Sequence, residues 1–240
     1  MELSRIRRII ADSMFHSISS TAQLTINASF DASRILELRK RFREKQAIAG
    51  ENPAAFSNIT VTDMILYAVS RVILNHRELN AHFIQDKMLL FNNVHLGFAV
   101  DTERGLMVPT IFNANRKTLQ EISEEASLLA QQCKKGTINP DLLKGATFTV
   151  TNLGPLGIES FTPILNPPQT GILGVNTIIH RFKEKDGCHV LYPSIGLSLT
   201  FDHRAVDGAP AARFLRDLGA ALENFSTCDA PGSNSERKEN

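Results

Sequence analysis

Cysteine is scarce in this sequence of 240 residues, and its cysteines do not form a motif. Cys133, Cys188 and Cys228 are odd in number, far apart and without C-x-x-C spacing. This pattern argues against a disulfide framework and against a zinc site. We therefore expect a reducing compartment and no bound metal.

Long hydrophobic runs are also missing. The longest apolar runs fall far short of the roughly 18 residues that a membrane helix needs, and the N-terminus lacks the apolar segment of a signal peptide. The first 17 residues are arginine-rich and amphipathic like a transit peptide, but Glu2 and Asp12 break the acid-poor composition of such peptides. We predict a cytoplasmic protein, or one of the mitochondrial matrix if the source is eukaryotic, with no membrane partner.

The sequence has no excess of charge of one sign. Its 26 basic and 25 acidic residues give a formal net charge of +1, so no global field recruits nucleic acid, and an anionic ligand must meet a local cluster. One basic run, Arg39 to Lys45, lies on a predicted helix that begins after Asp31 and buries Ile35, Leu38 and Phe42. We interpret this run as a solvated helix surface in preference to a phosphate site.

Several catalytic motifs are absent. The sequence contains no G-x-S-x-G elbow, H-E-x-x-H pair, Walker loop or G-x-G-x-x-G turn after a strand, which disfavours covalent serine chemistry, zinc hydrolysis and dinucleotide redox. The triplet Asp86, Lys87, Met88 resembles the turn that carries lipoyl-lysine in lipoyl domains. Its helical surroundings do not suit that all-β module, so we predict a plain hairpin turn.

The hydrophobic residues, 42% of the chain, show the periodicities of both helices and strands. Helices are predicted for the arm containing Ile6, Ile9, Ile10 and Met14, after Asp31, over 61–76, from Thr118 to about Cys133, and from Pro210. Strands are predicted over 24–30, 81–85, 87–91, 94–100, 146–153, 171–182 and 189–201. Without strict alternation, repeats or a break in composition, this mixture indicates one α+β domain, a two-layer sandwich of mixed sheet and helices.

Local signals sharpen this outline. Thr118 and Glu121 form a capping box, Asp186 and Gly187 form a hairpin turn, and Pro210 starts a helix that turns Phe214, Leu215, Leu218 and Leu222 inward. The segment 154–171 is rich in glycine and proline but contains large apolar residues, so we expect an ordered irregular loop. Residues 226–240 are predicted to be a disordered tail.

The stretch TFDHRAVDGAP, residues 200–210, places His203, Asp207 and Gly208 between a strand and a helix. Imidazole, with an ordinary pKa of about 6.5, can act as a base at neutral pH. The competing interpretation is a histidine satisfied by a backbone carbonyl, with Asp207 capping the helix, and the pattern alone does not separate the two. The other histidines are isolated and predicted to be packed or on the surface: His16, His76, His82, His95, His180 and His189.

A specific resemblance adds to this interpretation. The segments 200–218 and 146–176, with RIRRIIADSM (5–14) and VHLGFAVDTERGLMVPTI (94–111), resemble the catalytic domain of the dihydrolipoamide acyltransferases, the core component of 2-oxo acid dehydrogenase complexes. The resemblance covers residues 3 to 225. Chloramphenicol acetyltransferase shares the fold and histidine motif of this family but lacks the match to NLGPLGIESFTPILNPP (152–168).

The resemblance implies a chloramphenicol acetyltransferase-like catalytic domain over 1–225, with an N-terminal helical arm over 1–20 and no lipoyl or subunit-binding domain in this chain. It implies a homotrimer, open to further assembly into a cubic or dodecahedral core, with other components of the complex as partners. Coenzyme A would reach the site from one side, and a lipoyl group presented by a separate domain or chain from the other. His203 would be the catalytic base, Asp207 would support its geometry, and the Thr151 hydroxyl would stabilise an oxyanion.

The implied reaction moves an acyl group between two thiols. We expect direct transfer in a ternary complex, because no activated serine or cysteine accompanies the histidine motif. Two alternatives stay open: a non-catalytic assembly scaffold of the same fold, and a soluble CoA-dependent acetyltransferase with another acceptor. The acyl group (acetyl, succinyl, branched-chain or acetoin-derived) and the CoA-contacting residues stay open as well.

Overall fold

The computed structural model of the chain describes residues 5–48 and 59–226. The predicted disordered tail therefore lies, but for its first residue, outside the described residues. The helices are α1 (Arg5–Ser20), α2 (Ser33–Ile48), α3 (Val61–Val72), α4 (Leu119–Lys135) and α5 (Gly208–Glu223). The strands are β1 (Gln23–Asp31), β2 (Ala81–Ile84), β3 (Lys87–Leu90), β4 (Leu96–Phe98), β5 (Thr110–Ile111), β6 (Phe148–Asn152), β7 (Gly171–Lys185) and β8 (Cys188–Asp202).

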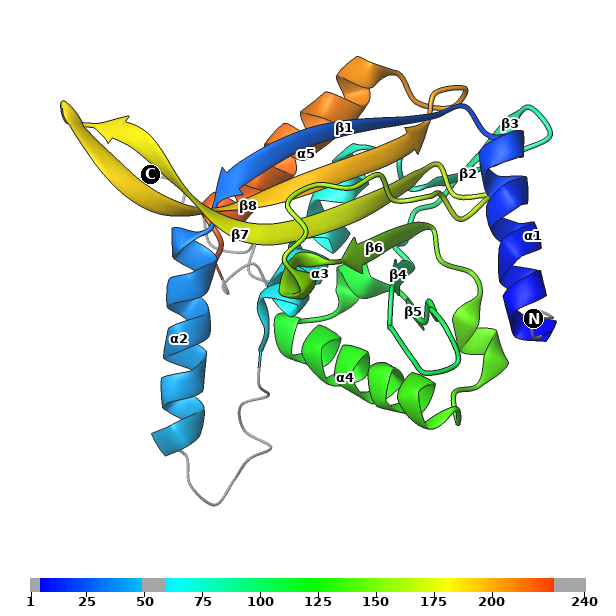
Figure 1. Ribbon diagram of the computed structural model, residues 1–240, viewed down its shortest axis with the longest axis horizontal. Coiled ribbons are helices and arrows are strands. Elements are labelled where there is room, and N and C mark those ends of the chain that lie inside the picture. The colour runs from blue at the N-terminus through cyan, green and yellow to red at the C-terminus, as the bar shows by residue number, and fades with distance from the viewer. Residues whose placement is uncertain (1–4, 49–58, 227–240) are drawn as a thin grey trace, which may run out of the picture.

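A six-stranded mixed sheet organises the molecule, in the order β1-β8-β7-β6-β4-β5. β6 runs parallel to β4 and to β7, and the remaining neighbours are antiparallel. β2 and β3 form a separate two-stranded sheet. In Figure 1, β1, β8 and β7 lie side by side, and the β7–β8 hairpin extends past the body beside α2.

The core lies between the sheet and a helical layer, which confirms the predicted two-layer α+β architecture. α5 packs on β1, α3 and α2, and α3 also packs on α4. Strand alternation turns Leu197, Leu199 and Phe201 of β8 into this core, fully buried. The other face of β8 is polar: Thr200 shares a hydroxyl hydrogen bond of 2.7 Å with Thr25 of β1.

The predicted local signals are present. The Thr118 hydroxyl accepts a hydrogen bond from the Glu121 N–H at 3.2 Å, and the Glu121 carboxylate accepts one from the Thr118 N–H at 2.7 Å. Asp186 and Gly187 have φ of 53° and 76°, the positive values that a two-residue type I′ hairpin turn requires. Asp31 accepts from the N–H of Ser33, the first residue of α2, at 2.9 Å.

Other elements differ from the prediction. The helix predicted over 61–76 is α-helical only to Val72 and ends in a 3₁₀ turn at Ile73–Asn75. The strand predicted over 94–100 is shorter, Leu96–Phe98, because only these residues form a continuous ladder with β5 or β6, while Ala99 makes a single further bond to Val150. None of the helices within 5–48 and 59–226 has the length and apolar character needed to cross a membrane.

Candidate active site

The turn from β8 into α5 positions His203. Its backbone N–H donates to the carbonyl of Ala22 at 2.8 Å, so this turn is joined to the segment between α1 and β1. The imidazole Nδ1 lies 3.8 Å from Oδ1 of Asp207, and the two side chains are 45% and 82% exposed. This distance is too long for a hydrogen bond, so the His203 imidazole is accessible to solvent and has a carboxylate beside it.

Asp207 stands at the N-cap of α5, but its side chain makes no capping hydrogen bond. The competing interpretation, in which Asp207 caps the helix, is confirmed for its position at the N-cap, but the carboxylate does not bond the helix N-terminus. The carboxylate faces the imidazole and solvent.

Two residues that the sequence interpretation did not single out hold this turn in place. Asp202, which is almost fully buried, accepts hydrogen bonds from the Arg204 guanidinium at 2.6 and 3.0 Å and from the Ala22 N–H at 3.3 Å. Burial by itself would raise the pKa of Asp202, but the hydrogen bonds and charge of Arg204 outweigh it and lower that pKa below its usual value. The only sequence signal was that an acid and a base flank His203.

Thr151 lies on a different part of the sheet. In β6, Phe148 and Val150 are in the core, so Thr149 and Thr151 point to the opposite face. Thr151 pairs with Gly174 of β7. A Cβ at Gly174 would come within 2.7 Å of the Phe161 ring, so the irregular loop after β6 covers the sheet beside Thr151. The prediction of an ordered loop is correct.

A single chain does not bring His203 and Thr151 together. Gly174, the partner of Thr151, pairs with Ser198 of β8, and Ser198 precedes His203 by five residues. At 3.3 Å per residue, His203 lies about 16 Å from Thr151 along the strand direction. Across the sheet the two residues are separated by two strand spacings, about 10 Å. Of the three predicted catalytic residues, the chain gathers His203 and Asp207 and leaves Thr151 apart.

A pocket of about 480 Å³ opens at the end of β6, lined by Asn152, the residue that follows Thr151. It lies between α2, the start of α3, the end of β6 and β7, where the Asn152 amide donates to the Thr62 hydroxyl at 2.9 Å. Its lining includes Arg39, Thr60, Thr62, Asn152, Gly154 and Asn176. The basic run on α2 is therefore not all solvated surface, because Arg39 contributes to the pocket wall. Arg41, by contrast, forms an ion pair with Glu37 at 2.5 Å on the helix surface.

A second pocket, of about 370 Å³, lies behind the His203 turn. Asp202 and Arg204 form one wall, His16 of α1 lies on another, and the Arg204 guanidinium is 4.8 Å from the centre of the Phe83 ring. The two pockets thus adjoin the two separated parts of the predicted site.

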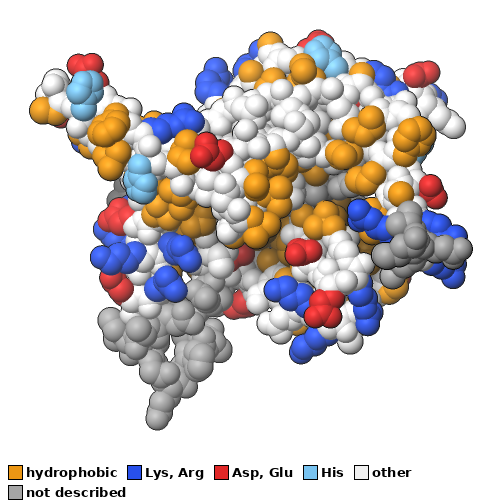
Figure 2. All heavy atoms as spheres, viewed as in Figure 1, with side chains coloured by type: hydrophobic (Ala, Val, Ile, Leu, Met, Phe, Trp, Pro, Cys, Tyr) orange, Lys and Arg blue, Asp and Glu red, His pale blue; other side chains and the backbone are white. Residues whose placement is uncertain are grey.

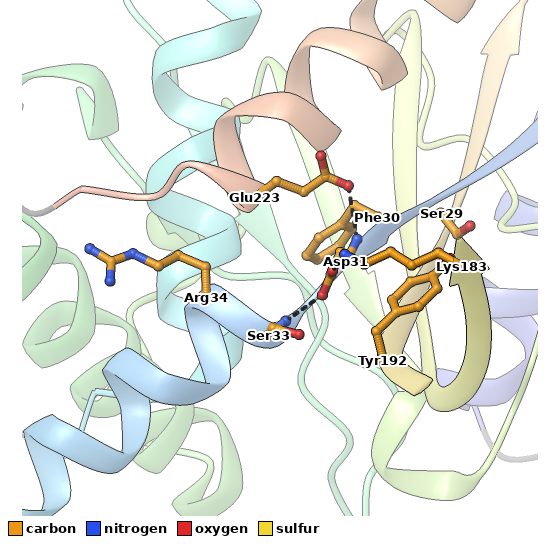
Figure 3. A pocket seen from close by; sticks show the side chains of 8 residues that line it. All are labelled: Ser29, Phe30, Asp31, Ser33, Arg34, Lys183, Tyr192 and Glu223. Atoms are coloured by element: carbon orange, nitrogen blue, oxygen red, sulfur yellow. Dashed lines mark hydrogen bonds and ion pairs between the residues drawn. The ribbon is translucent and has the colours of Figure 1, made fainter. Parts of the chain in front are cut away.

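A third pocket, of about 450 Å³, contains none of the predicted site residues (Figure 3). Lys183 forms an ion pair with Asp31 and lies over the Tyr192 ring at 4.9 Å. The Asp31 N–H donates to Glu223 at 2.9 Å. These contacts join β1, α5 and the β7–β8 hairpin. Because the main charges of the pocket are paired with one another, we assign it a structural role.

Three of the other histidines are packed, as predicted. His76 Nε2 lies 3.1 Å from Asp217, and His82 Nε2 lies 2.9 Å from the carbonyl of Ala146. His95 accepts from the Asn113 N–H at 3.1 Å, and burial, together with the nearby charge of His82, lowers its pKa. Within 5–48 and 59–226, no three His, Cys, Asp or Glu side chains gather as a metal site.

The fold shows the structural class of the protein. A solved chloramphenicol acetyltransferase superposes with a TM-score of 0.54 and 14% identity, covering 92% of this chain and 99% of its own. The chain therefore has a chloramphenicol acetyltransferase-like α+β fold. It belongs to the 2-oxoacid dehydrogenase acyltransferases, because the family model of their catalytic domain matches residues 1–228.

Individual relatives agree with this family. The dihydrolipoyllysine-residue acetyltransferase component of the acetoin cleaving system of Bacillus subtilis is 38% identical over 222 residues, which are 91% of this chain and 54% of that protein. This chain thus spans about half the length of the curated relatives it matches.

Two solved structures, each with a TM-score of 0.87 and 30% identity over 93% of this chain and 90% of their own, are also similar. One is the dihydrolipoamide acetyltransferase of Azotobacter vinelandii, studied for the catalytic roles of a serine, a histidine 52 residues later and an asparagine four residues beyond that. The other is the cubic core of a pyruvate dehydrogenase multienzyme complex.

Proposed function

We propose that this chain transfers an acyl group between dihydrolipoyl-lysine and coenzyme A, in a site that two copies of the chain complete together in a homotrimer. The observation that carries the proposal is the separation of His203 from Thr151 within one chain. A base and an oxyanion donor that act on one carbonyl must lie within a few ångströms of it. The His203 of one copy therefore meets the Thr151 of another.

Residue spacing supports these roles. Thr151, His203 and Asp207 follow one another at intervals of 52 and four residues, the same intervals as the serine, histidine and asparagine studied in the Azotobacter enzyme. A hydroxyl is present at the first position in both chains. At the third, this chain has a carboxylate in place of the amide.

The side chains of His203 and Thr151 are sufficient for the steps of the proposed acyl transfer. His203 takes the proton of the CoA thiol while its sulfur attacks the carbonyl carbon of the acyl-lipoyl thioester, and the Thr151 hydroxyl donates a hydrogen bond to the resulting oxyanion. When the intermediate collapses, the bond to the lipoyl sulfur breaks and that sulfur takes the proton from His203. Since a thiol has a pKa of about 8.5 and imidazole about 6.5, the first proton transfer costs about 2.7 kcal/mol, well within reach of catalysis.

The pocket at the end of β6, lined by Asn152 and Arg39, suits coenzyme A. Its phosphates are anionic, and the pocket presents the Arg39 guanidinium. Arginine favours phosphate. The thiol end of the ligand would then pass around the end of β6 to reach Thr151, whose side chain lies on the opposite face of the sheet. The lipoyl group, carried on a separate domain or chain, approaches from the His203 side.

The larger assembly is part of the same proposal. The homotrimer is the unit from which a cubic or dodecahedral core would be built, with the other components of a 2-oxo acid dehydrogenase complex as partners, as the cubic core of a similar chain suggests. A cytoplasmic or mitochondrial-matrix location remains a prediction from the sequence.

Transfer of the acyl group from acetyl-, succinyl- and isobutyryl-CoA to free dihydrolipoamide tests the activity. His203→Ala should lower kcat at least about 100-fold, the usual contribution of a general base, whereas Lys134→Ala, an exposed change on α4, should not alter it. Transfer that survives His203→Ala would contradict the assigned base. An assembled protein that transfers from no donor would favour the non-catalytic scaffold, and transfer to another acceptor alone would favour the soluble acetyltransferase.

A further inference from the structure

A buried asparagine on β7 has an unused hydrogen-bond acceptor. Asn176 is only 4% exposed, and its Nδ2 donates to the Ser198 hydroxyl at 3.1 Å. Its Oδ1 is buried too and accepts no hydrogen bond from the part of the chain that the structure describes. Leaving a buried carbonyl oxygen unpaired costs free energy, so this oxygen calls for a donor that the chain itself does not supply.

The orientation of this amide is set by the hydrogen bonds of Ser198. The Ser198 hydroxyl has one proton and donates it to Oδ1 of Asn27 on β1 at 2.7 Å. Towards Asn176 the same hydroxyl can therefore only accept. The Asn176 Nδ2 faces Ser198 for this reason, and its Oδ1 is turned away from Ser198.

Two glycines make room for Asn176. A Cβ at Gly196 of β8 would lie 2.8 Å from Nδ2 of Asn176, and a Cβ at Gly154 would lie 2.6 Å from the Asn176 carbonyl oxygen. A larger residue at either position would displace the asparagine or strain its surroundings. The place of Asn176 is therefore fixed jointly by β7, by β8 and by the loop after β6.

Asn176 lies on the same face of the sheet as Thr151. Thr151 pairs with Gly174, Gly174 pairs with Ser198, and paired residues share a face. One strand spacing and two residues of β7 separate Thr151 from Asn176, about 8 Å between their Cα atoms. Figure 2 shows this face, where the surface over the middle of β1 and β8 is mostly white, the colour of uncharged polar side chains and backbone.

Asn176 also lines the pocket that we assign to coenzyme A, together with Arg39 and Gly154. In the proposed pose, the ligand passes from this pocket around the end of β6 to Thr151. Asn176 lies along that path, because it borders the pocket and shares the face of Thr151. The part of coenzyme A that meets Asn176 is therefore the pantetheine arm, between the phosphates and the thiol.

We propose that Oδ1 of Asn176 accepts a hydrogen bond from the pantetheine amide nearest the thiol of coenzyme A; this inference rests on the proposed function and adds a binding residue to it. Two carbon atoms separate that amide nitrogen from the sulfur, so the N–H lies a short step from a thioester carbonyl at Thr151. In dihydrolipoyl-lysine a longer chain of methylene groups separates the amide from the thiols. The spacing from Thr151 to Asn176 therefore favours coenzyme A as the source of the donor.

A matched pair of ligands tests this contact without any substitution in the protein. One ligand is coenzyme A, and the other is its analogue with an ester oxygen in place of that amide N–H. In isothermal titration calorimetry, the wild type should bind coenzyme A at least about tenfold more tightly, because the ester leaves Oδ1 unpaired. Equal affinities for the two ligands would overturn the proposal, and so would a protein that binds neither.

Two variants locate this preference at Asn176. In Asn176→Ala the acceptor is gone, so the affinities for the two ligands should agree within about twofold. Asn27→Ala is the matched control, because it breaks the same row of hydrogen bonds at its far end, leaves Oδ1 of Asn176 in place and should keep the preference. A folded Asn176→Ala protein that still prefers the amide would assign the contact to another residue. If this variant does not fold, the ligand pair on the wild type still decides.

The two proposals fail separately. A wild type that prefers the amide in binding but transfers no acyl group would remove the function and keep the contact. A wild type that transfers normally and binds the amide and the ester equally would remove the contact and keep the function.

Discussion

At the scale of the single residue, Thr151 is the sharpest chemical prediction. Thr151→Ala removes one hydrogen bond to the oxyanion, so kcat should fall about 100- to 1,000-fold, with KM for acyl-CoA little changed. Thr151→Ser keeps the hydroxyl and should retain activity within about tenfold of wild type. Steady-state kinetics on the three proteins measures both effects, and equal activity in the alanine and serine variants would count against the oxyanion role.

Asp202 links stability to pH. Because its pKa in the folded protein lies below its usual value of 3.8, its ionised form stabilises the fold fully above that value, and the stabilisation is lost as pH falls through the lowered pKa. Asp202→Asn should lower the free energy of unfolding by about 2 kcal/mol at pH 7, the value of a buried charged hydrogen bond.

Urea titrations of the wild type and Asp202→Asn at several pH values give the comparison. The difference between the two proteins should shrink as the wild-type carboxylate becomes protonated. A difference that stays constant from pH 7 to well below 3.8 would show that the Arg204 ion pair is not its source.

At the scale of the element, the loop after β6 depends on Gly174. A Cβ there meets the Phe161 ring at 2.7 Å, so Gly174→Ala should destabilise the fold by about 1–3 kcal/mol, as overpacking does. Phe161→Leu should partly restore stability in the double variant, because the smaller side chain makes room. Thermal unfolding of the two single variants and the double variant measures this coupling, and strictly additive effects would mean that the two residues are not in contact.

The first turn of α4 gives a second element-scale prediction. Thr118→Ala removes the two hydrogen bonds of the Thr118 hydroxyl, one accepted from the Glu121 N–H and one donated to the Glu121 carboxylate, and should cost about 1 kcal/mol. Hydrogen bonds from the backbone and hydroxyl of Thr118 lower the pKa of Glu121 below its usual value, so this effect too should weaken as the solution is acidified. Chemical unfolding at pH 7 and pH 4 provides the measurement; an effect independent of pH would exclude a contribution from the Glu121 charge.

Elements governed by neighbouring residues were predictable, and those governed by distant ones were not. The capping box, the Asp186–Gly187 turn and the buried stripe of α5 each depend on residues a few positions apart. The sequence also indicated that His203 and Asp207 lie close together. The local sequence could not place Thr151 two strands from β8, because strand order is decided by long-range pairing. It also could not show that Arg39 of α2 lines a pocket.

At the scale of the whole molecule, a site shared between copies predicts complementation. His203→Ala and Thr151→Ala are each expected to be inactive, but in oligomers refolded from an equal mixture some sites combine an intact His203 with an intact Thr151 from the next copy. In a cyclic oligomer with random mixing this holds for about one quarter of the sites, so about one quarter of wild-type activity should return.

The complementation assay follows acyl transfer before and after co-refolding. Mixing the two variants without subunit exchange is the control, and it should show no recovery. Refolded mixtures that stay inactive, although sedimentation shows that mixed oligomers have formed, would place the complete site within one chain.

The pairing of β1 with β8 has a consequence for how the protein is made. Gln23 lies opposite Asp202, so β1, the first of the described strands to be synthesised, pairs with β8, the last of them. Until β8 is synthesised, β1 and the core face of the unfinished sheet are open to other chains, as expected for topologies dominated by distant contacts. During synthesis, this domain should therefore depend on chaperones until its last strand and helix emerge.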